Sequence, residues 1–164
     1  NDIAGLLRPG ALEAVASSDC GICIMHMQGE PGTMQQAPDY ADVVAEVRGF
    51  LAGSVTRCRA AGIAEDRLVL DPGFGFGKTL EHNLALFRGL PELAVDGLPL
   101  LVGVSRKTML GAITGRSVEQ RESASVAAAL IAAQKGAKIL RVHDVAATRD
   151  ALAVWAAIEN GERK

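Results

Sequence analysis

Four short runs rich in valine, isoleucine and leucine recur along the chain, and they limit its fold more than any other feature. They lie at residues 21–27, 67–71, 98–104 and 137–142. Each run is almost continuously hydrophobic, which is typical of parallel strands that are covered on both faces. The sequence therefore predicts four buried parallel strands.

Helical segments separate these runs. Apolar residues recur three and four positions apart within residues 39–61, which predicts an amphipathic helix. Gly62 follows this helix, and Gly136 follows an alanine-rich helix that is expected to begin near Glu122. Glycine is common at these places because it adopts the left-handed conformation that ends many helices.

A last helix is predicted over residues 146–159. Its expected core contacts are Leu152, Val154, Trp155 and Ile158. The alternation of strand and helix, without a linker or a second compositional regime, predicts one α/β domain with right-handed parallel crossovers. A complete (β/α)8 barrel of the TIM type takes about 250 residues, so this chain is expected to be a partial barrel of roughly four βα units.

Charge and hydropathy argue against two kinds of partner. The net charge is -2 and the pI is near 5.9, so the chain lacks the basic surface that a nucleic-acid backbone requires. The longest apolar stretch, residues 124–133, is shorter than the roughly 20 residues of a membrane-spanning helix. We therefore expect neither nucleic acid nor a membrane as a partner.

The three cysteines are too few for a disulfide framework and fit a reducing cytoplasm. Cys20 and Cys23 form a C-x-x-C pair, but a zinc ribbon needs a second pair, which the sequence lacks. We expect these two thiols and Cys58 to be buried structural groups, as free cysteines usually are. Because the chain opens with Asn1 rather than methionine, we also expect it to be part of a longer protein.

Polar residues that could bind a ligand or take part in catalysis stand at the C-terminal ends of all four predicted strands. They occur within residues 25–27, 71–78, 103–107 and 141–144. In parallel α/β folds the loops at this edge converge on one mouth, where active sites form. The sequence therefore predicts one shared functional site.

The glycine-rich segment 71–78 fits neither nucleotide-binding template. In G-x-x-x-x-G-K-[ST] the first glycine would fall on Pro72, and in G-x-G-x-x-G the third would fall on Lys78. We interpret the segment as a sharp loop that presents Phe74 or Phe76 to a flat ligand, with a purely structural loop as the alternative.

Asp71 is a carboxylate at the end of an apolar strand, where it needs a charged or fork-shaped donor. A ligand with a guanidine-like N–C–N edge would donate two parallel hydrogen bonds to it, and the alternative is a salt bridge to a lysine or arginine. The later strand ends carry groups suited to an anionic substrate or leaving group. They are Ser105, Arg106, Lys107, Arg141 and His143. Taken alone, Arg106 fits a solvated surface residue, and His26 fits a satisfied core histidine.

Five motifs follow one another in this chain. They are Asn1-Asp2, M-H-M-Q-G at residues 25–29, L-D-P-G-F-G-F-G-K at 70–78, G-V-S-R-K at 103–107 and R-V-H-D-V at 141–145. In this order they resemble the dihydropteroate synthase family, and the resemblance spans almost the whole chain. It implies that residues 1–164 form the C-terminal portion of a single pterin-binding TIM-barrel domain.

The resemblance implies a transferase of folate biosynthesis. This family condenses 6-hydroxymethyl-7,8-dihydropterin pyrophosphate with p-aminobenzoate, giving 7,8-dihydropteroate and pyrophosphate, and sulfonamide drugs compete with p-aminobenzoate. Pyrophosphate, neutralised by Mg2+ and cationic side chains, leaves a methylene group that the aromatic amine attacks. Leaving-group stabilisation and positioning would therefore dominate catalysis.

The resemblance also implies roles for individual residues on the pterin. Asp71 and Asn1 would hydrogen-bond its aminopyrimidine edge, and Lys107 would reach its carbonyl and ring nitrogen. Met25 and Gly103 would line the slot.

Three residues would act at the reacting centre, namely Lys107, Arg141 and His143. Arg141 would stack over the pterin ring, and together with His143 it would bind the pyrophosphate. The p-aminobenzoate pocket would be bordered by Ser105, Phe76 and Arg106.

Several parts of the family pattern are expected upstream of Asn1. They include the early strands, an asparagine that assists the Mg2+, a second pterin-binding aspartate and two mobile loops. We therefore expect Mg2+ as a cofactor but no metal site in this chain, which is expected to be inactive alone. The complete enzyme is expected to be a cytoplasmic homodimer. The apolar C-terminal helices fit a dimer contact and fit packing in the barrel's outer ring equally well.

Two other functions compete with this interpretation. A pterin-binding methyltransferase of the same barrel type would share the aspartate, although the S-R-K and R-V-H-D segments favour the synthase. A non-catalytic relative that only binds pterin would keep the same motifs.

Overall fold

The computed structural model describes residues 1–161 and contains four short parallel strands. They are β1 (Ile22–Met25), β2 (Leu68–Asp71), β3 (Leu101–Val102) and β4 (Ile139–Leu140). β1 pairs with β2 and β3 pairs with β4, while a parallel bridge between Leu70 and Leu100 joins the two pairs. A further bridge places Asp2 beside Ile24 of β1. Strands that follow one another in sequence are therefore neighbours in space, as in a β/α barrel.

Each predicted run contains a strand, but the strands are shorter than predicted. Hydrogen bonds continue the pairing beyond their ends: the backbone N–H of His26 donates to Asp71 O at 3.0 Å, and that of Arg141 donates to Val102 O at 3.0 Å. Pairing between β2 and β3 is limited to one bridge, so regular ladder geometry is lost there. The parallel arrangement is nevertheless as predicted.

The two faces of the sheet differ in burial. Helix-facing side chains join the core and are fully buried: Ile22, Ile24, Leu68, Leu70, Leu100 and Val102. On the opposite face Cys23, Val69 and Leu101 are only half-buried and Ile139 is exposed. The expected cover on both faces is therefore only partly present, since on this second face Met25 and Asp71, at the ends of β1 and β2, are buried as well. Four strands do not close a barrel, which leaves the remaining positions of this face partly uncovered.

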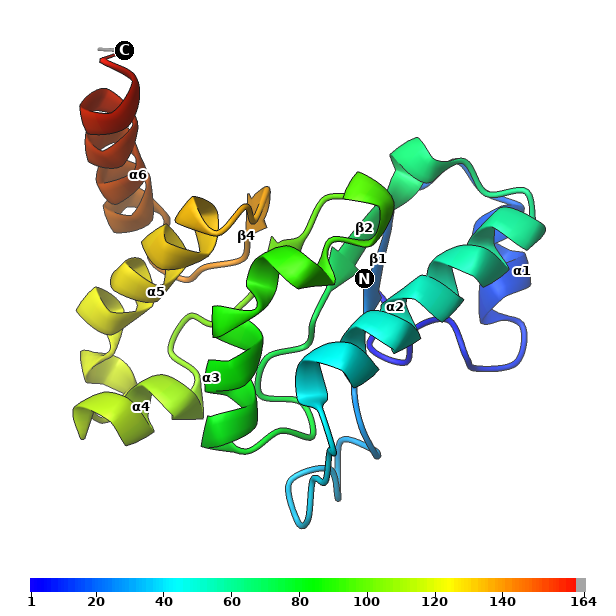
Figure 1. Cartoon of the computed structure of the whole chain (residues 1–164), viewed down its shortest axis with the longest axis horizontal. Coiled ribbons are helices and arrows are strands. Elements are labelled where there is room, and N and C mark those ends of the chain that lie inside the picture. The colour runs from blue at the N-terminus through cyan, green and yellow to red at the C-terminus, as the bar shows by residue number, and fades with distance from the viewer. Residues whose placement is uncertain (162–164) are drawn as a thin grey trace.

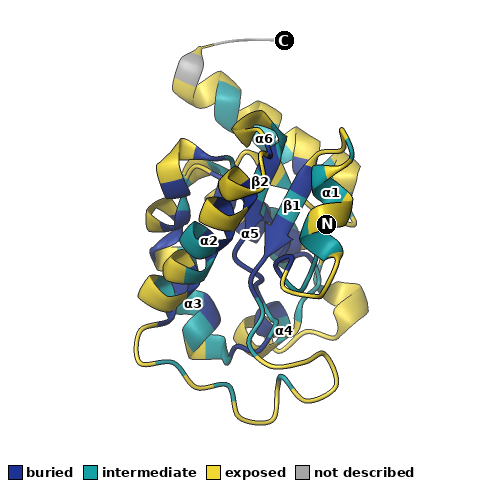
Figure 2. Cartoon of the chain, turned by 90° about the vertical axis from the view of Figure 1, so that its right-hand side faces the viewer, coloured by how far each residue is buried: buried dark blue, intermediate teal, exposed yellow. Residues whose placement is uncertain are grey.

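Residues 1–161 also form six α-helices and four short 3-10 turns, and all but α1 and α6 lie between successive strands (Figure 1). The helices are α1 (Ala11–Ala16), α2 (Val43–Ala60), α3 (Leu80–Arg88), α4 (Thr108–Thr114), α5 (Glu122–Gln134) and α6 (Val145–Asn160). The turns are η1 (Glu65–Arg67), η2 (Leu90–Leu93), η3 (Val95–Gly97) and η4 (Val118–Gln120). Figure 2 shows buried residues on the strands and exposed residues on the outer sides of the helices.

The predicted helix ends are confirmed with small shifts. α2 begins at Val43 because the Asp42 carboxylate caps it, accepting hydrogen bonds from the N–H groups of Val44 and Ala45 at 3.0 Å each. Gly62 and Gly136 follow α2 and α5, and both have positive φ.

Two expected core contacts of α6 are wrong. Val154 and Ile158 are 60% and 75% exposed, whereas Leu152 and Trp155 are half-buried. α6 packs against α5 and extends away from the rest of the chain (Figure 1). Its apolar face is therefore only partly covered by the described residues.

The cysteines differ from expectation at one position. Cys58 is buried and Cys23 is half-buried, but Cys20 is exposed. Among residues 1–161, no helix combines the length and hydrophobicity needed to cross a membrane.

Candidate active site

The structure brings together side chains from all four strand ends. Asp71, the last residue of β2, is 1% exposed, and its Oδ1 accepts a hydrogen bond from the Gly73 N–H at 2.8 Å. Its Oδ2 accepts one from Nη2 of Arg141, beyond β4, at 3.0 Å. The salt bridge that sequence reasoning left open as an alternative is thus present in this structure.

Arg141 reaches Asp71 across a position that must be small. A Cβ at Gly103 would lie only 2.7 Å from Nη2 of Arg141. Gly103 therefore leaves room for the guanidinium group, whose side chain is 42% exposed beside the buried carboxylate. Arg141 is thus the solvent-accessible partner of this pair and Asp71 the buried one.

Two other predicted residues lie at the β1 edge of the site. Met25 is buried and is the register partner of Asp71 in the β1–β2 ladder. Asn1 is exposed, and the bridge from Asp2 to Ile24 holds the start of the chain beside β1.

Lys107 connects the β3 end with the glycine-rich loop after β2. Its Nζ donates a hydrogen bond to Phe74 O and lies 4.7 Å from the centre of the Phe76 ring. Burial lowers the pKa of Lys107 to about 8; Asp71 opposes this shift and Arg141 adds to it.

Of the two phenylalanines considered for ligand contact, the structure favours one. Phe74 is fully buried and packs on Phe87, with ring centres 5.2 Å apart. Phe76 is half-buried and faces Lys107. Phe74 is therefore a core residue, and Phe76 remains available to a ligand.

Lys78 and His26 form a buried pair that sequence reasoning missed as part of the site. Nζ of Lys78 donates to Nδ1 of His26 at 2.9 Å and to the carbonyl groups of Gly73 and Phe76 at 3.0 Å each. Burial lowers the pKa of Lys78 to about 7, with Asp71 opposing the shift and Lys107 adding to it. A lysine that ends a glycine-rich loop was the available signal, because such a loop leaves carbonyl groups that need donors.

His26 is a satisfied core histidine, as the simpler interpretation held. Burial, together with the charge of Lys78, lowers its pKa to about 3, so the ring is neutral and accepts a hydrogen bond from the lysine. Its ring meets Phe50 edge-on at 4.9 Å.

The glycine-rich loop is held closely against the β1 loop. A Cβ at Gly73 would collide with His26 O, and one at Gly77 would collide with Gln28 O. Tyr40 donates its hydroxyl to Gly77 O at 2.8 Å. The loop conformation therefore depends on glycine for close approach as well as for turning.

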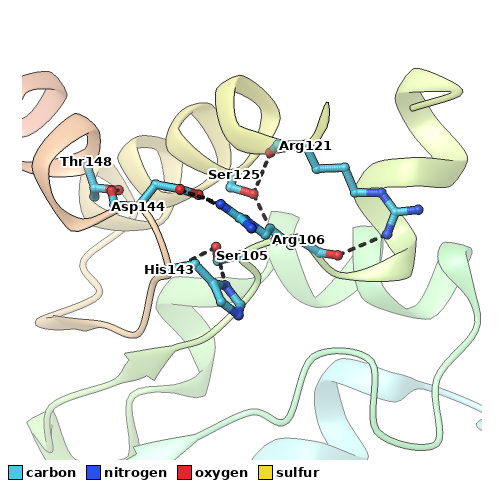
Figure 3. A network of polar contacts seen from close by, with 7 residues as sticks. All are labelled: Ser105, Arg106, Arg121, Ser125, His143, Asp144 and Thr148. Carbon is cyan, nitrogen blue, oxygen red and sulfur yellow. Dashed lines mark hydrogen bonds and ion pairs between the residues drawn. The ribbon is translucent and has the colours of Figure 1, made fainter. Parts of the chain in front are cut away.

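Ser105 and Arg106 contact the loop that follows β4 (Figure 3). Oγ of Ser105 lies 2.9 Å from Nδ1 of His143 and accepts the His143 backbone N–H at 3.2 Å. Arg106 donates to both oxygens of Asp144, at 2.6 and 3.2 Å. Arg106 is thus ion-paired while its side chain stays 34% exposed, and Asp144 is a partner that sequence reasoning did not single out.

A cavity of about 560 Å³ lies beside these residues. It is lined by Met34, Gln35, Gly75, Phe76, Lys78, Leu80, Asn83, Arg106, Lys107, Thr108, Met109, Ala112, Val118 and Arg121. Asp71, Arg141 and His143 do not line this cavity, whereas Arg106 and Lys107 do, so the cavity includes part of the predicted site. Within residues 1–161, no three His, Cys, Asp or Glu side chains gather as a metal site would require.

Known proteins resemble this chain over most of its length. A family model described as "Pterin binding enzyme" matches residues 1–143. The dihydropteroate synthase of Neisseria meningitidis serogroup C is 56% identical over 161 residues, which cover 96% of this chain and 57% of that protein. The Escherichia coli K12 dihydropteroate synthase is 53% identical over 154 residues, covering 94% and 55%. The chain thus spans a little more than half the length of these relatives.

Solved structures are also similar to this chain. The Yersinia pestis dihydropteroate synthase with a sulfonamide drug complex superposes with a TM-score of 0.93 at 49% identity, covering 99% of this chain and 59% of that one. The Stenotrophomonas maltophilia dihydropteroate synthase superposes with a TM-score of 0.95 at 52% identity, covering 99% and 62%. The predicted fold, a partial (β/α)8 barrel, is confirmed by these matches, and the chain belongs to the pterin-binding enzyme family.

Proposed function

We propose that residues 1–164 are the C-terminal portion of the pterin-binding barrel of a dihydropteroate synthase. The complete enzyme would join 6-hydroxymethyl-7,8-dihydropterin pyrophosphate to p-aminobenzoate, forming 7,8-dihydropteroate and pyrophosphate. A Burkholderia cenocepacia dihydropteroate synthase, 51% identical, has been solved with 7,8-dihydropteroate, and one from Xanthomonas albilineans, 52% identical, with 4-aminobenzoic acid. The observation that carries the proposal is the buried Asp71 carboxylate beside Lys107 and Arg141.

The pterin would replace Arg141 at Asp71. Oδ1 of Asp71 accepts a hydrogen bond from Gly73, while Oδ2 accepts one from the half-exposed guanidinium group of Arg141. A pterin presents a similar N–C–N edge, so the exchange keeps the buried carboxylate hydrogen-bonded. Arg141 would then be free to stack over the ring and to bind pyrophosphate with His143, while Asn1, Met25 and Gly103 border the slot.

The second substrate would bind at the adjoining cavity. Phe76 supplies an aromatic face for the p-aminobenzoate ring, and Arg106 lines the same cavity. Ser105, which contacts His143, would border the pocket next to Arg106. Sulfonamides would compete for this place. Lys107, which also lines this cavity, would hydrogen-bond the pterin.

The reaction would be a substitution at the pterin methylene carbon, in which a C–N bond replaces a C–O bond. The C–O bond to pyrophosphate breaks, and its electron pair leaves with pyrophosphate, stabilised by Arg141 and His143. The amine nitrogen of p-aminobenzoate forms the new C–N bond and releases a proton to solvent. Lys107, Arg141 and His143 would thus be the catalytic residues, without a covalent enzyme intermediate.

The complete enzyme would also require Mg2+, form a homodimer and be located in the cytoplasm. Mg2+ would neutralise the pyrophosphate, with ligands from the substrate and from residues outside this chain. The exposed Val154 and Ile158 of α6 support a dimer contact, and the three free cysteines fit a reducing compartment.

An assay of pyrophosphate release tests the proposal. The complete enzyme should release pyrophosphate only when both the pterin pyrophosphate and p-aminobenzoate are present, and the 164-residue chain alone should not. Methyl transfer to a corrinoid would support the methyltransferase instead. Pterin binding without turnover in the complete protein would support a non-catalytic relative.

A further inference from the structure

Arg106 has an unusual backbone conformation for its residue type. Its φ is 57°, in the left-handed region where a Cβ clashes with the following carbonyl group. Among the described non-glycine residues, Leu6 and Asp96 share this region, and neither lies among the site residues. Such a conformation persists where surrounding contacts over-determine it.

Both backbone polar groups of Arg106 are bound by the start of α5 (Figure 3). The Arg106 N–H donates to Oγ of the buried Ser125 at 2.8 Å, and the Arg106 carbonyl accepts from Nη1 of Arg121 at 3.0 Å. Ser125 in turn donates its hydroxyl to the Arg121 carbonyl at 2.6 Å. One turn of the chain, residues 121–125, therefore hydrogen-bonds both backbone polar groups of Arg106.

A glycine in α4 leaves room for the Arg121 side chain that binds the Arg106 carbonyl. A Cβ at Gly111 would collide with the guanidinium group of Arg121. Glycine inside a helix lowers helix stability relative to alanine. The packing of Arg121 gives a physical reason for glycine at this place.

The conformation of Arg106 directs its two neighbours to different loops. Ser105 contacts His143 beyond β4, whereas Lys107 contacts Phe74 and Phe76 beyond β2. A left-handed residue between them turns the chain sharply enough for both contacts. A change at Arg106 would therefore shift both neighbouring side chains at once.

We infer that Ser125 and Arg121 are positioning residues that hold the Arg106 peptide in its left-handed conformation and so aim Ser105 and Lys107 at the substrates. The inference rests on the proposed synthase function. Neither residue needs to touch the pterin to act in this way.

The test compares Ser125→Ala with a matched control in the complete synthase. Ser54, on α2, is also a buried serine that donates to the carbonyl four residues earlier, Phe50 O, and accepts from an arginine, Arg57. Both substitutions should lower Tm similarly. Only Ser125→Ala should lower kcat, by about tenfold, and raise KM for p-aminobenzoate, because it alone disturbs groups that must be oriented.

Two further variants separate positioning from folding. In an Arg106→Gly background, adding Ser125→Ala should change kcat by less than about twofold, because glycine adopts this φ without the hydrogen bonds to Ser125 and Arg121. Gly111→Ala should raise the helix propensity of α4, yet displace Arg121 and lower kcat several-fold.

The outcomes are distinct. If Ser125→Ala and Ser54→Ala have equal kcat values, or if the Ser125→Ala loss is undiminished in the Arg106→Gly background, the inference is wrong. Unchanged kcat in Gly111→Ala would also contradict it. Absence of pyrophosphate release by the unmodified complete protein would instead overturn the proposed function on which the inference rests.

Discussion

Nζ of Lys78 lies 2.9 Å from Nδ1 of His26, with both side chains buried. The same amine binds the carbonyl groups of Gly73 and Phe76, so it ties the loop after β2 to the end of β1. Because His26 is neutral, it accepts this hydrogen bond without adding a second positive charge. The pair supports the loop that carries Phe76.

Lys78 should make stability depend on pH. Its pKa falls from 10.5 to about 7 on folding, so between these values the unfolded chain binds more protons than the folded one. The free energy of unfolding should therefore rise with pH by about 1 kcal/mol per unit in this window, and the contribution is lost as pH falls toward 7. Urea unfolding at about pH 7.5 and about pH 9.5 gives the rise in the free energy of unfolding between these two pH values. This rise should be smaller in Lys78→Met than in the unmodified protein.

Lys107 keeps its own contribution in both proteins, since its pKa is also lowered, to about 8. Lys135→Met, which removes a lysine bound to Arg88 O, is the control for losing a lysine side chain outside this loop. An equal rise of the free energy of unfolding with pH in Lys78→Met and the unmodified protein would show that the Lys78 amine does not titrate in this window.

Asp71→Asn should weaken pterin binding by roughly 2 to 5 kcal/mol, because it removes the charge from a buried, charge-assisted pair. Calorimetry with a pterin and the complete synthase measures this loss. Asp96→Asn is the control, since it weakens an exposed ion pair with Arg59. Unchanged affinity in Asp71→Asn would mean that the carboxylate serves the fold alone.

Phe76→Leu should raise KM for p-aminobenzoate about fivefold, as expected when an aromatic contact worth about 1 kcal/mol is lost, and leave pterin affinity unchanged. Steady-state kinetics with varied p-aminobenzoate measures the effect. Phe87→Leu alters the neighbouring core contact with Phe74 instead, so it should lower Tm without this change in KM. A parallel rise in both variants would argue against a direct contact with Phe76.

Asp42→Ala should destabilise the protein by about 1 kcal/mol, because the first turn of α2 loses its cap. Asp42→Asn keeps a capping oxygen and should retain most of the stability. Urea unfolding of both variants checks the prediction. Pterin affinity should be equal in the two, since α2 lies behind the sheet.

Local patterns in the sequence determined the framework of this protein. Burial of continuous apolar runs specified the parallel strands, and helical periodicity with Gly62 and Gly136 specified where α2 and α5 end. The chemistry at the strand ends could be predicted because parallel strands bring their C-terminal ends to one edge. These features depend on neighbours within a few residues, which a sequence displays directly.

Tertiary structure alone decided how the site residues are paired. Asp71 meets Arg141, 70 positions away, and Lys78 meets His26, 52 positions away. It also decided that Phe74 enters the core, that Val154 and Ile158 remain exposed, and that Arg106 adopts a left-handed conformation. Such outcomes follow from the register of the strands and the packing of helices behind them, because these set which distant groups meet at hydrogen-bonding distance.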